Sequence, residues 1–219
     1  MTITKHPTEE TLAAYAAGHL DEGRSIVVQA HAERCAVCRT WIARLWTLGG
    51  VQLADLAPTA MSGEALAHVL AQIDALGPRA ESSAQRSGAS FGVSDVAAFP
   101  LAAQDYPAGA WKWMAPGVHW RPLAGPGDHG ARVFLLKAAP GTIMPHHTHT
   151  GTELTLVLSG AFAHAGGRYG PGDLDEADMS VEHQPVVESG EECVCLVAME
   201  GKLHLLGLLG RVLQPFVRL

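Results

Sequence analysis

The sequence predicts a two-domain α + β protein, with a small N-terminal helical bundle, a linker and a C-terminal β domain. Residues 1–76 repeat their apolar side chains at helical spacing, and residues 77–95 contain almost no bulky apolar side chains. Residues 96–219 alternate short apolar runs with Gly and Pro, as strands and turns do. A length of 219 residues leaves room for one medium domain or two small ones, and the 47% hydrophobic composition is ample for a packed core.

Four helices are expected in the first 76 residues. The first starts after an N-cap at Thr8 and runs to Ala17, the second covers about 21–34, and the third covers about 37–56. Ser62 is expected to cap a fourth helix, whose apolar face consists of Leu66, Val69, Leu70 and Ile73. Because a helical domain of this size has a small core, a structural metal would add to its stability.

The segment 77–95 has the Gly, Ser, Ala and Pro composition of a linker, although a long surface loop is the alternative. Beyond residue 96, turn residues recur every few positions between runs of strand length. This pattern favours a β-sandwich or a small barrel. Strands are expected at about 111–114, 118–121, 132–138, 153–158 and 192–199.

The charge disfavours direct binding to nucleic acid. Asp and Glu total 22 against 15 Lys and Arg, a formal charge of −7, and residues 1–76 hold eight acidic and five basic side chains. The N-terminus has no apolar leader and no run is long enough to cross a membrane, so we expect a cytoplasmic protein. The acidic stretch between residues 173 and 192 is expected to be a solvated face.

The first candidate metal site has the spacing HxxxCxxC, formed by His31, Cys35 and Cys38. Residues four apart share a helix face, and two thiolates with an imidazole favour Zn²⁺ in a closed four-coordinate site. His6 is the best candidate for the fourth ligand. The alternatives are a redox-active CxxC pair, or two core cysteines beside a surface histidine.

The second candidate site is His147, His149, Glu153 and His183. Residues two apart on a strand point to the same side, so His147 and His149 converge. With Gly141 and Gly160 as spacers, His147, His149 and Glu153 resemble the first motif of the cupin family, which implies a cupin β-barrel. Its second motif is recognisable through Gly172 and His183, with three departures from the expected Pro, Gly and Asn at Asp178, Ser180 and Val187. Three imidazoles and a carboxylate suit Zn, Mn, Fe, Ni or Cu.

Cys193 and Cys195 lie on one face of an apolar run and are expected to line the cupin interior. Buried structural thiols and a redox-sensitive pair near the metal both fit this placement. His146 is expected to point away from the metal. The other histidines, His164 among them, are expected to be surface residues or locally hydrogen-bonded.

Together, the HxxxCxxC helices and the cupin motif resemble the ChrR-type zinc-binding anti-sigma factors, over nearly the whole chain. The resemblance extends to residues 12–18, 31–38, 153–162, 193–196 and 214–216. It implies one zinc on His6, His31, Cys35 and Cys38, and a second on His147, His149, Glu153 and His183. It also places Cys193 and Cys195 with thiols near the second site.

The resemblance further implies a function. The helical domain would insert between the two conserved domains of a group IV (extracytoplasmic function, ECF) sigma factor and block binding to core RNA polymerase. The cupin domain, residues 96–219, would sense an oxidative signal such as singlet oxygen. The alternative is a metal-dependent cupin enzyme, a dioxygenase or isomerase, with an accessory helical domain.

Overall fold

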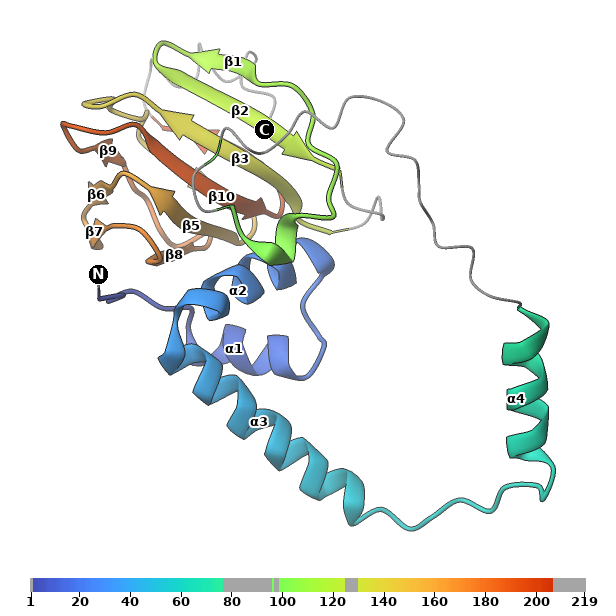
Figure 1. Ribbon diagram of the computed structural model, residues 1–219. Coiled ribbons are helices and arrows are strands. Elements are labelled where there is room, and N and C mark those ends of the chain that lie inside the picture. Colours follow the sequence, from blue (N-terminus) through green and yellow to red (C-terminus); the bar gives the residue numbers. More distant parts are fainter. Residues whose placement is uncertain (1, 77–95, 97–98, 125–129, 207–219) are drawn as a thin grey trace.

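The computed structural model describes residues 2–76, 96, 99–124 and 130–206. Helix α1 (Glu9–Ala16) begins at Thr8, whose side chain accepts a hydrogen bond from the Thr11 amide. Helices α2 (Glu22–Arg34) and α3 (Ala36–Ala54) follow close to their predicted bounds, and α4 (Ala65–Ala75) contains the apolar positions predicted for a fourth helix (Figure 1). The prediction that Ser62 caps α4 is wrong, because Glu64 occupies the N-cap and makes no side-chain cap hydrogen bond.

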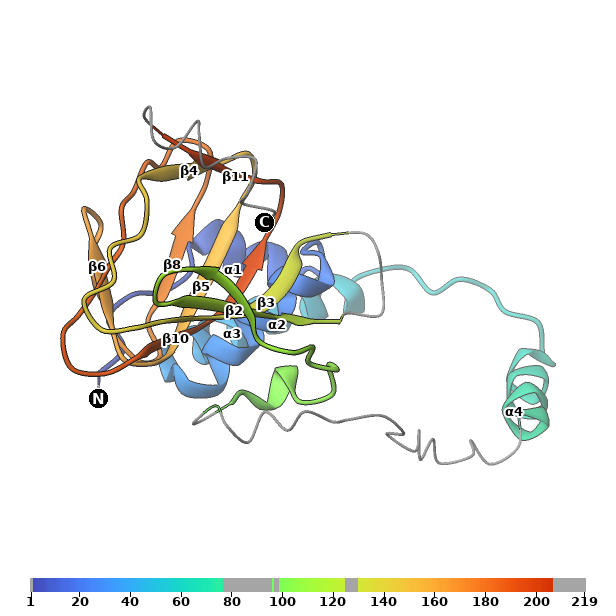
Figure 2. The same cartoon turned by 90° about the horizontal axis from the view of Figure 1, so that it is seen from above.

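The β domain is built around an antiparallel six-stranded sheet with the order β1-β2-β3-β10-β5-β8. Among the described residues, two smaller sheets, β11-β4 and β7-β6-β9, complete the cupin-like fold without a continuous hydrogen-bonded barrel wall (Figure 2). A short 3-10 helix, η2 (Leu101–Ala103), precedes the first strand. The strands are β1 (Lys112–Ala115), β2 (Val118–Leu123), β3 (Arg132–Ala138), β4 (His147–His149), β5 (Glu153–Ser159), β6 (Phe162–His164), β7 (Gly167–Tyr169), β8 (Leu174–Ala177), β9 (Val186–Val187), β10 (Cys193–Met199) and β11 (Leu203–Leu205).

Strand β10, inside the large sheet, is buried on both faces, which explains why it is apolar without interruption. Leu196 and Ala198 belong to a core shared with the helices, whereas Cys195 and Val197 face the interior of the cupin fold. Helix α2 packs against β3, β5 and β10, and its buried Ile26 and Val27 join the same core as Leu156 (Figure 1). The first three helices and the sheet therefore form one packed unit.

Polar contacts reinforce this docking. The carboxylate of Glu33 accepts hydrogen bonds from the backbone amides of Leu101 and Ala102 at 3.0 and 2.7 Å, at the start of η2. The hydroxyl of Tyr106 donates to Glu22 at 2.6 Å. The linker predicted at 77–95 lies outside the described residues, as does the C-terminal match at 214–216, so the domain boundaries remain a prediction.

Helix α4 lies apart from the rest of the protein in both views (Figures 1 and 2) and has no buried residue. Its predicted apolar face is therefore exposed: Leu66 is 69% and Ile73 is 56% accessible. The second half of α3 is similar, with exposed Leu48 and Val51. None of the described helices combines the length and apolar character needed to span a bilayer.

Candidate metal centres

The first cluster brings together all four residues predicted for the helical site. His6, His31, Cys35 and Cys38 place their ligand atoms within 4.8 Å of one another. The His6 Nδ1 atom lies 3.3 and 3.4 Å from the Cys35 and Cys38 sulfurs, and His31 Nε2 lies 3.3 Å from the Cys38 sulfur. Tetrahedral zinc with ordinary bond lengths requires N···S separations of about 3.5 Å.

Local structure explains this convergence. His31 lies in the last turn of α2, and Cys35 is both the C-cap of α2 and the N-cap of α3. The Cys38 amide hydrogen bonds back to the Cys35 sulfur at 3.5 Å, which turns both thiols to the same side. His6 reaches them from the segment ahead of α1, which has no regular secondary structure.

The electrostatics of this cluster favour a bound cation. Burial lowers the pKa of His31 to about 4, so its imidazole stays neutral, as a metal ligand must be. Burial and the neighbouring Cys35 thiol raise the pKa of Cys38 to about 12, because a second thiolate beside the first is unfavourable without a positive charge. Two thiolates and two imidazoles form a donor set suited to Zn²⁺.

The second cluster consists of His147, His149 and His183, all buried. Their Nε2 atoms converge, with 2.9 Å between His183 and His147 and 3.2 Å between His183 and His149. His147 Nδ1 donates to the Pro145 carbonyl at 2.7 Å, which leaves its Nε2 lone pair directed at the other rings. Burial lowers the pKa of all three, that of His183 to about 3 with help from neighbouring His147. Converging neutral imidazoles of this kind fit a divalent cation.

Glu153, the fourth predicted ligand, begins β5 but is not part of this close group. Its carboxylate lies 3.7 Å from His149 Nδ1 and accepts a hydrogen bond from the Thr155 hydroxyl at 3.0 Å. Burial raises the Glu153 pKa against the opposing effect of His147. His149 Nδ1 is buried and has no hydrogen-bond partner among the described residues. The carboxylate therefore stands beside the three-histidine group rather than within it.

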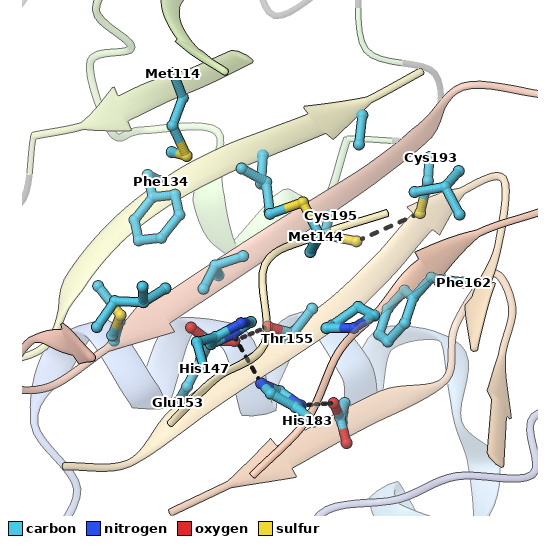
Figure 3. Close-up of a pocket in the computed structure, with 18 residues that line it drawn as sticks. Met114, Phe134, Met144, His147, Glu153, Thr155, Phe162, His183, Cys193 and Cys195 are labelled. Atoms are coloured by element: carbon cyan, nitrogen blue, oxygen red, sulfur yellow. Dashed lines mark hydrogen bonds and ion pairs between the residues drawn. The ribbon is translucent and has the colours of Figure 1, made fainter. Parts of the chain in front are cut away.

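An apolar cavity of about 80 Å³ adjoins this second cluster (Figure 3). Met144, Phe134 and Phe162 line it together with Cys193 and Cys195. The two sulfurs are 3.7 Å apart, and both cysteines are free and buried. The hydrogen bond with Cys193, together with burial, raises the pKa of Cys195. The pair faces the cupin interior, as the alternation of β10 predicts.

Sequence reasoning missed Asp175 and underrated His164. In β8, Asp175 is 6% exposed, and its carboxylate lies 2.9 Å from His164 Nε2 and 3.8 Å from His183 Nδ1. Although burial alone would raise it, hydrogen bonds from His164 and Tyr169 lower the Asp175 pKa. The predicted solvated face is therefore wrong at Asp173 and Asp175, both buried. No side-chain pattern in this run marks either carboxylate as inward-facing, because Leu174 between them is buried as well.

Comparison with known proteins agrees with this architecture. A family model described as the ChrR cupin-like domain matches residues 102–202. The anti-sigma-E factor ChrR of Cereibacter sphaeroides is 38% identical over 224 residues, which cover 100% of both chains. A chain in the crystal structure of Rhodobacter sphaeroides SigE in complex with the anti-sigma ChrR is 38% identical, with a TM-score of 0.71, over 91% of this chain and 100% of that one.

A more distant solved structure is an RmlC-like cupin protein from Ralstonia eutropha, 25% identical, with a TM-score of 0.40 over 45% of this chain and 68% of that one. The full-length match includes both the helices with their HxxxCxxC cluster and the cupin-like domain, so it confirms the resemblance predicted from the motifs. The chain belongs to the ChrR family of anti-sigma factors.

Proposed function

We propose that this protein is a cytoplasmic anti-sigma factor that sequesters an ECF sigma factor through its N-terminal helices. The observation that carries the proposal is the full-length relationship to a protein named as an anti-sigma factor, whose solved relative is in complex with SigE. Function is then exerted by mass action: sigma factor held in the complex is unavailable to RNA polymerase.

The exposed apolar surface of the helices supports this proposal. Helix α4 buries nothing, and the C-terminal half of α3 is equally open, although both carry large aliphatic side chains. A soluble chain rarely leaves such a surface uncovered unless a partner covers it. The exposed side chains are Leu48, Val51, Leu53, Leu56, Leu66, Val69, Leu70, Ile73 and Leu76.

We assign zinc to the helical cluster, where it would hold α2, α3 and the segment bearing His6 together. A second divalent metal, for which we favour zinc, would occupy the three-histidine cluster with Glu153 nearby. The cupin domain would be the sensor, and Cys193 and Cys195 would be its oxidisable groups. An oxidative signal such as singlet oxygen would then lower the affinity of the helices for the sigma factor.

The enzyme alternative has less support. The cavity beside the three histidines is small and apolar, and its described lining includes no Lys or Arg that would anchor an acidic substrate. Family membership points to regulation instead. Two zinc ions per chain would support the regulator, whereas iron or manganese in the cupin cluster would reopen the enzyme interpretation.

Transcription in vitro tests the proposal. The zinc-loaded chain should inhibit transcription that depends on its ECF sigma factor, and a Cys35→Ser/Cys38→Ser double variant should not inhibit. A Cys193→Ser/Cys195→Ser variant is the matched control, because it removes two buried thiols outside the helical cluster and should inhibit normally. Retained inhibition by the first double variant would overturn the zinc-dependent clamp.

A further inference from the structure

The β domain contributes directly to the helical metal cluster. The Gly172 carbonyl, in the turn before β8, lies 2.9 Å from His31 Nδ1. Since a carbonyl oxygen only accepts, His31 Nδ1 carries the proton and donates it, which leaves Nε2 unprotonated on the side facing Cys38. A hydrogen bond of this kind fixes the tautomer and orientation of a metal-binding histidine.

The same turn fixes the backbone ahead of His6. The Asp173 carboxylate accepts hydrogen bonds from the backbone amides of Thr4 and Lys5 at 2.7 and 2.9 Å, and the Leu174 amide donates to the Lys5 carbonyl at 3.2 Å. Asp173 is itself held, since it accepts from the Gly170 amide at 2.9 Å. The two residues before His6 are thus tied to the β domain rather than to the helices.

Asp175, two residues beyond Asp173, lies beside the second cluster. Asp175 bonds His164 and faces His183 Nδ1 at 3.8 Å. That nitrogen is buried and has no hydrogen-bond partner among the described residues. Residues 172–175 can span at most about 11 Å when fully extended, so both clusters lie along one short stretch of chain. Leu174 pairs with Leu156 in the central sheet, which limits how far this stretch can shift without disturbing its neighbours.

We propose that residues 172–175, here called the supporting segment, position ligands of both metal centres and couple their metal affinities. Gly172 and Asp173 orient His31 and His6, and Asp175 orients His183. A change at the cupin centre that moves Asp175 therefore moves the groups that hold the helical ligands. The inference rests on the two metal centres assigned in the proposed function, and it goes beyond them by naming the groups that connect them.

Cobalt titration of the full-length chain tests the first part. Thiolate-to-cobalt charge transfer reports on the helical centre, because Cys193 and Cys195 of the cupin cavity are not among the ligands assigned to the cupin metal. We expect Asp173→Ala to lower cobalt affinity at the helical centre by about 10- to 100-fold, the usual effect of removing a group that orients a ligand. Asp173→Asn keeps an acceptor oxygen and should recover most of the affinity.

The matched control is Asp178→Ala. Asp178 belongs to the same acidic stretch, but its side chain accepts hydrogen bonds from exposed Ser180 and contacts neither cluster. If Asp173→Ala binds cobalt at the helical centre as tightly as this control does, the positioning role is refuted. A wild-type chain with no charge-transfer band would instead refute the helical metal centre itself, so the two failures are distinguishable.

A second titration tests the coupling. His149→Ala should empty the cupin centre and lower cobalt affinity at the helical centre at least threefold in the wild-type background, but not in Asp173→Ala. Asp175→Asn should weaken the cupin centre by about 10- to 100-fold. Equal helical affinity with the cupin centre filled or empty would overturn the coupling. Binding of three cobalt equivalents by the wild-type chain, with one of them lost in Asp175→Asn, would also overturn the coupling. His164, Asp175 and His183 would then be ligands of an ion of their own.

Discussion

Docking of α2 on the sheet depends on a close approach at Gly23, and substitution by alanine measures it. A Cβ atom at Gly23 would lie 2.4 Å from the Ala131 carbonyl oxygen and 2.9 Å from a methyl group of Val133. The Ala131 backbone cannot easily retreat, because its amide donates to the Asp21 side chain at 3.2 Å.

Two opposing effects set the size of the change. Replacing Gly by Ala in a helix gains up to about 1 kcal/mol from propensity. Overpacking a close contact costs about 1–3 kcal/mol. We therefore expect Gly23→Ala to lower the free energy of unfolding by about 1–2 kcal/mol, a fall in Tm of roughly 2–8 °C for a chain of this size.

Thermal unfolding of the full-length chain, followed by circular dichroism, measures this effect. Gly49→Ala is the matched control, because Gly49 lies in α3 and a Cβ there would meet nothing within 4 Å. The control should gain stability from propensity alone. If Gly23→Ala unfolds at the same or a higher temperature than the control, α2 is not docked on the sheet in this way.

Three other outcomes follow from the same structure. In the metal-free chain, burial lowers the pKa of His31 to about 4 and that of His183 to about 3, so both groups take up protons more readily in the unfolded chain. The free energy of unfolding should therefore be highest above about pH 6.5 and fall as the pH drops through about 4 and then 3. Urea midpoints that do not fall between pH 7 and pH 5 would contradict this. Leu70→Asp should leave Tm within about 1 °C, because Leu70 is exposed and no residue of α4 is buried. The same variant should weaken binding to the sigma factor at least tenfold by titration calorimetry, and unchanged binding would remove α4 from the interface. Gly160 has φ +65°, and a Cβ there would lie 2.5 Å from the Glu192 carbonyl oxygen, whereas Gly141 has φ +73° and a Cβ there would meet nothing within 4 Å. Thermal melts should therefore show that Gly160→Ala is more destabilising than Gly141→Ala, and equal losses would contradict the close approach.

The sequence was most informative where a local rule operates. The bounds of α2 and α3 are predicted to within about two residues because capping and 3.6-residue periodicity are encoded locally. The HxxxCxxC spacing predicts the convergence of His31, Cys35 and Cys38, although Cys35 is the junction between two helices rather than part of one, and strand alternation predicts that of His147 and His149. The prediction that Ser62 caps α4 was wrong because a good capping residue near a helix start need not be the cap.

Features that depend on tertiary contact were not predictable from one sequence. Gly172 acts through its backbone carbonyl, which has no side-chain signature. Asp175 was grouped with exposed acidic neighbours, and only the pairing of β8 with β5 shows that it faces inward. The core shared by Val27 and Leu156 joins segments more than a hundred residues apart, so linker composition alone could not show how closely the two parts pack.

Direct binding to a sigma factor tests the central claim most simply. The full-length zinc-loaded chain should be mixed with purified ECF sigma factor from the same genome, starting with one encoded beside it. The mixture should then be analysed by size-exclusion chromatography with light scattering. The proposed function predicts a 1:1 complex at micromolar concentration that persists during elution. Separate elution of both proteins, with zinc present in the chain, for every ECF sigma factor of that genome would contradict it.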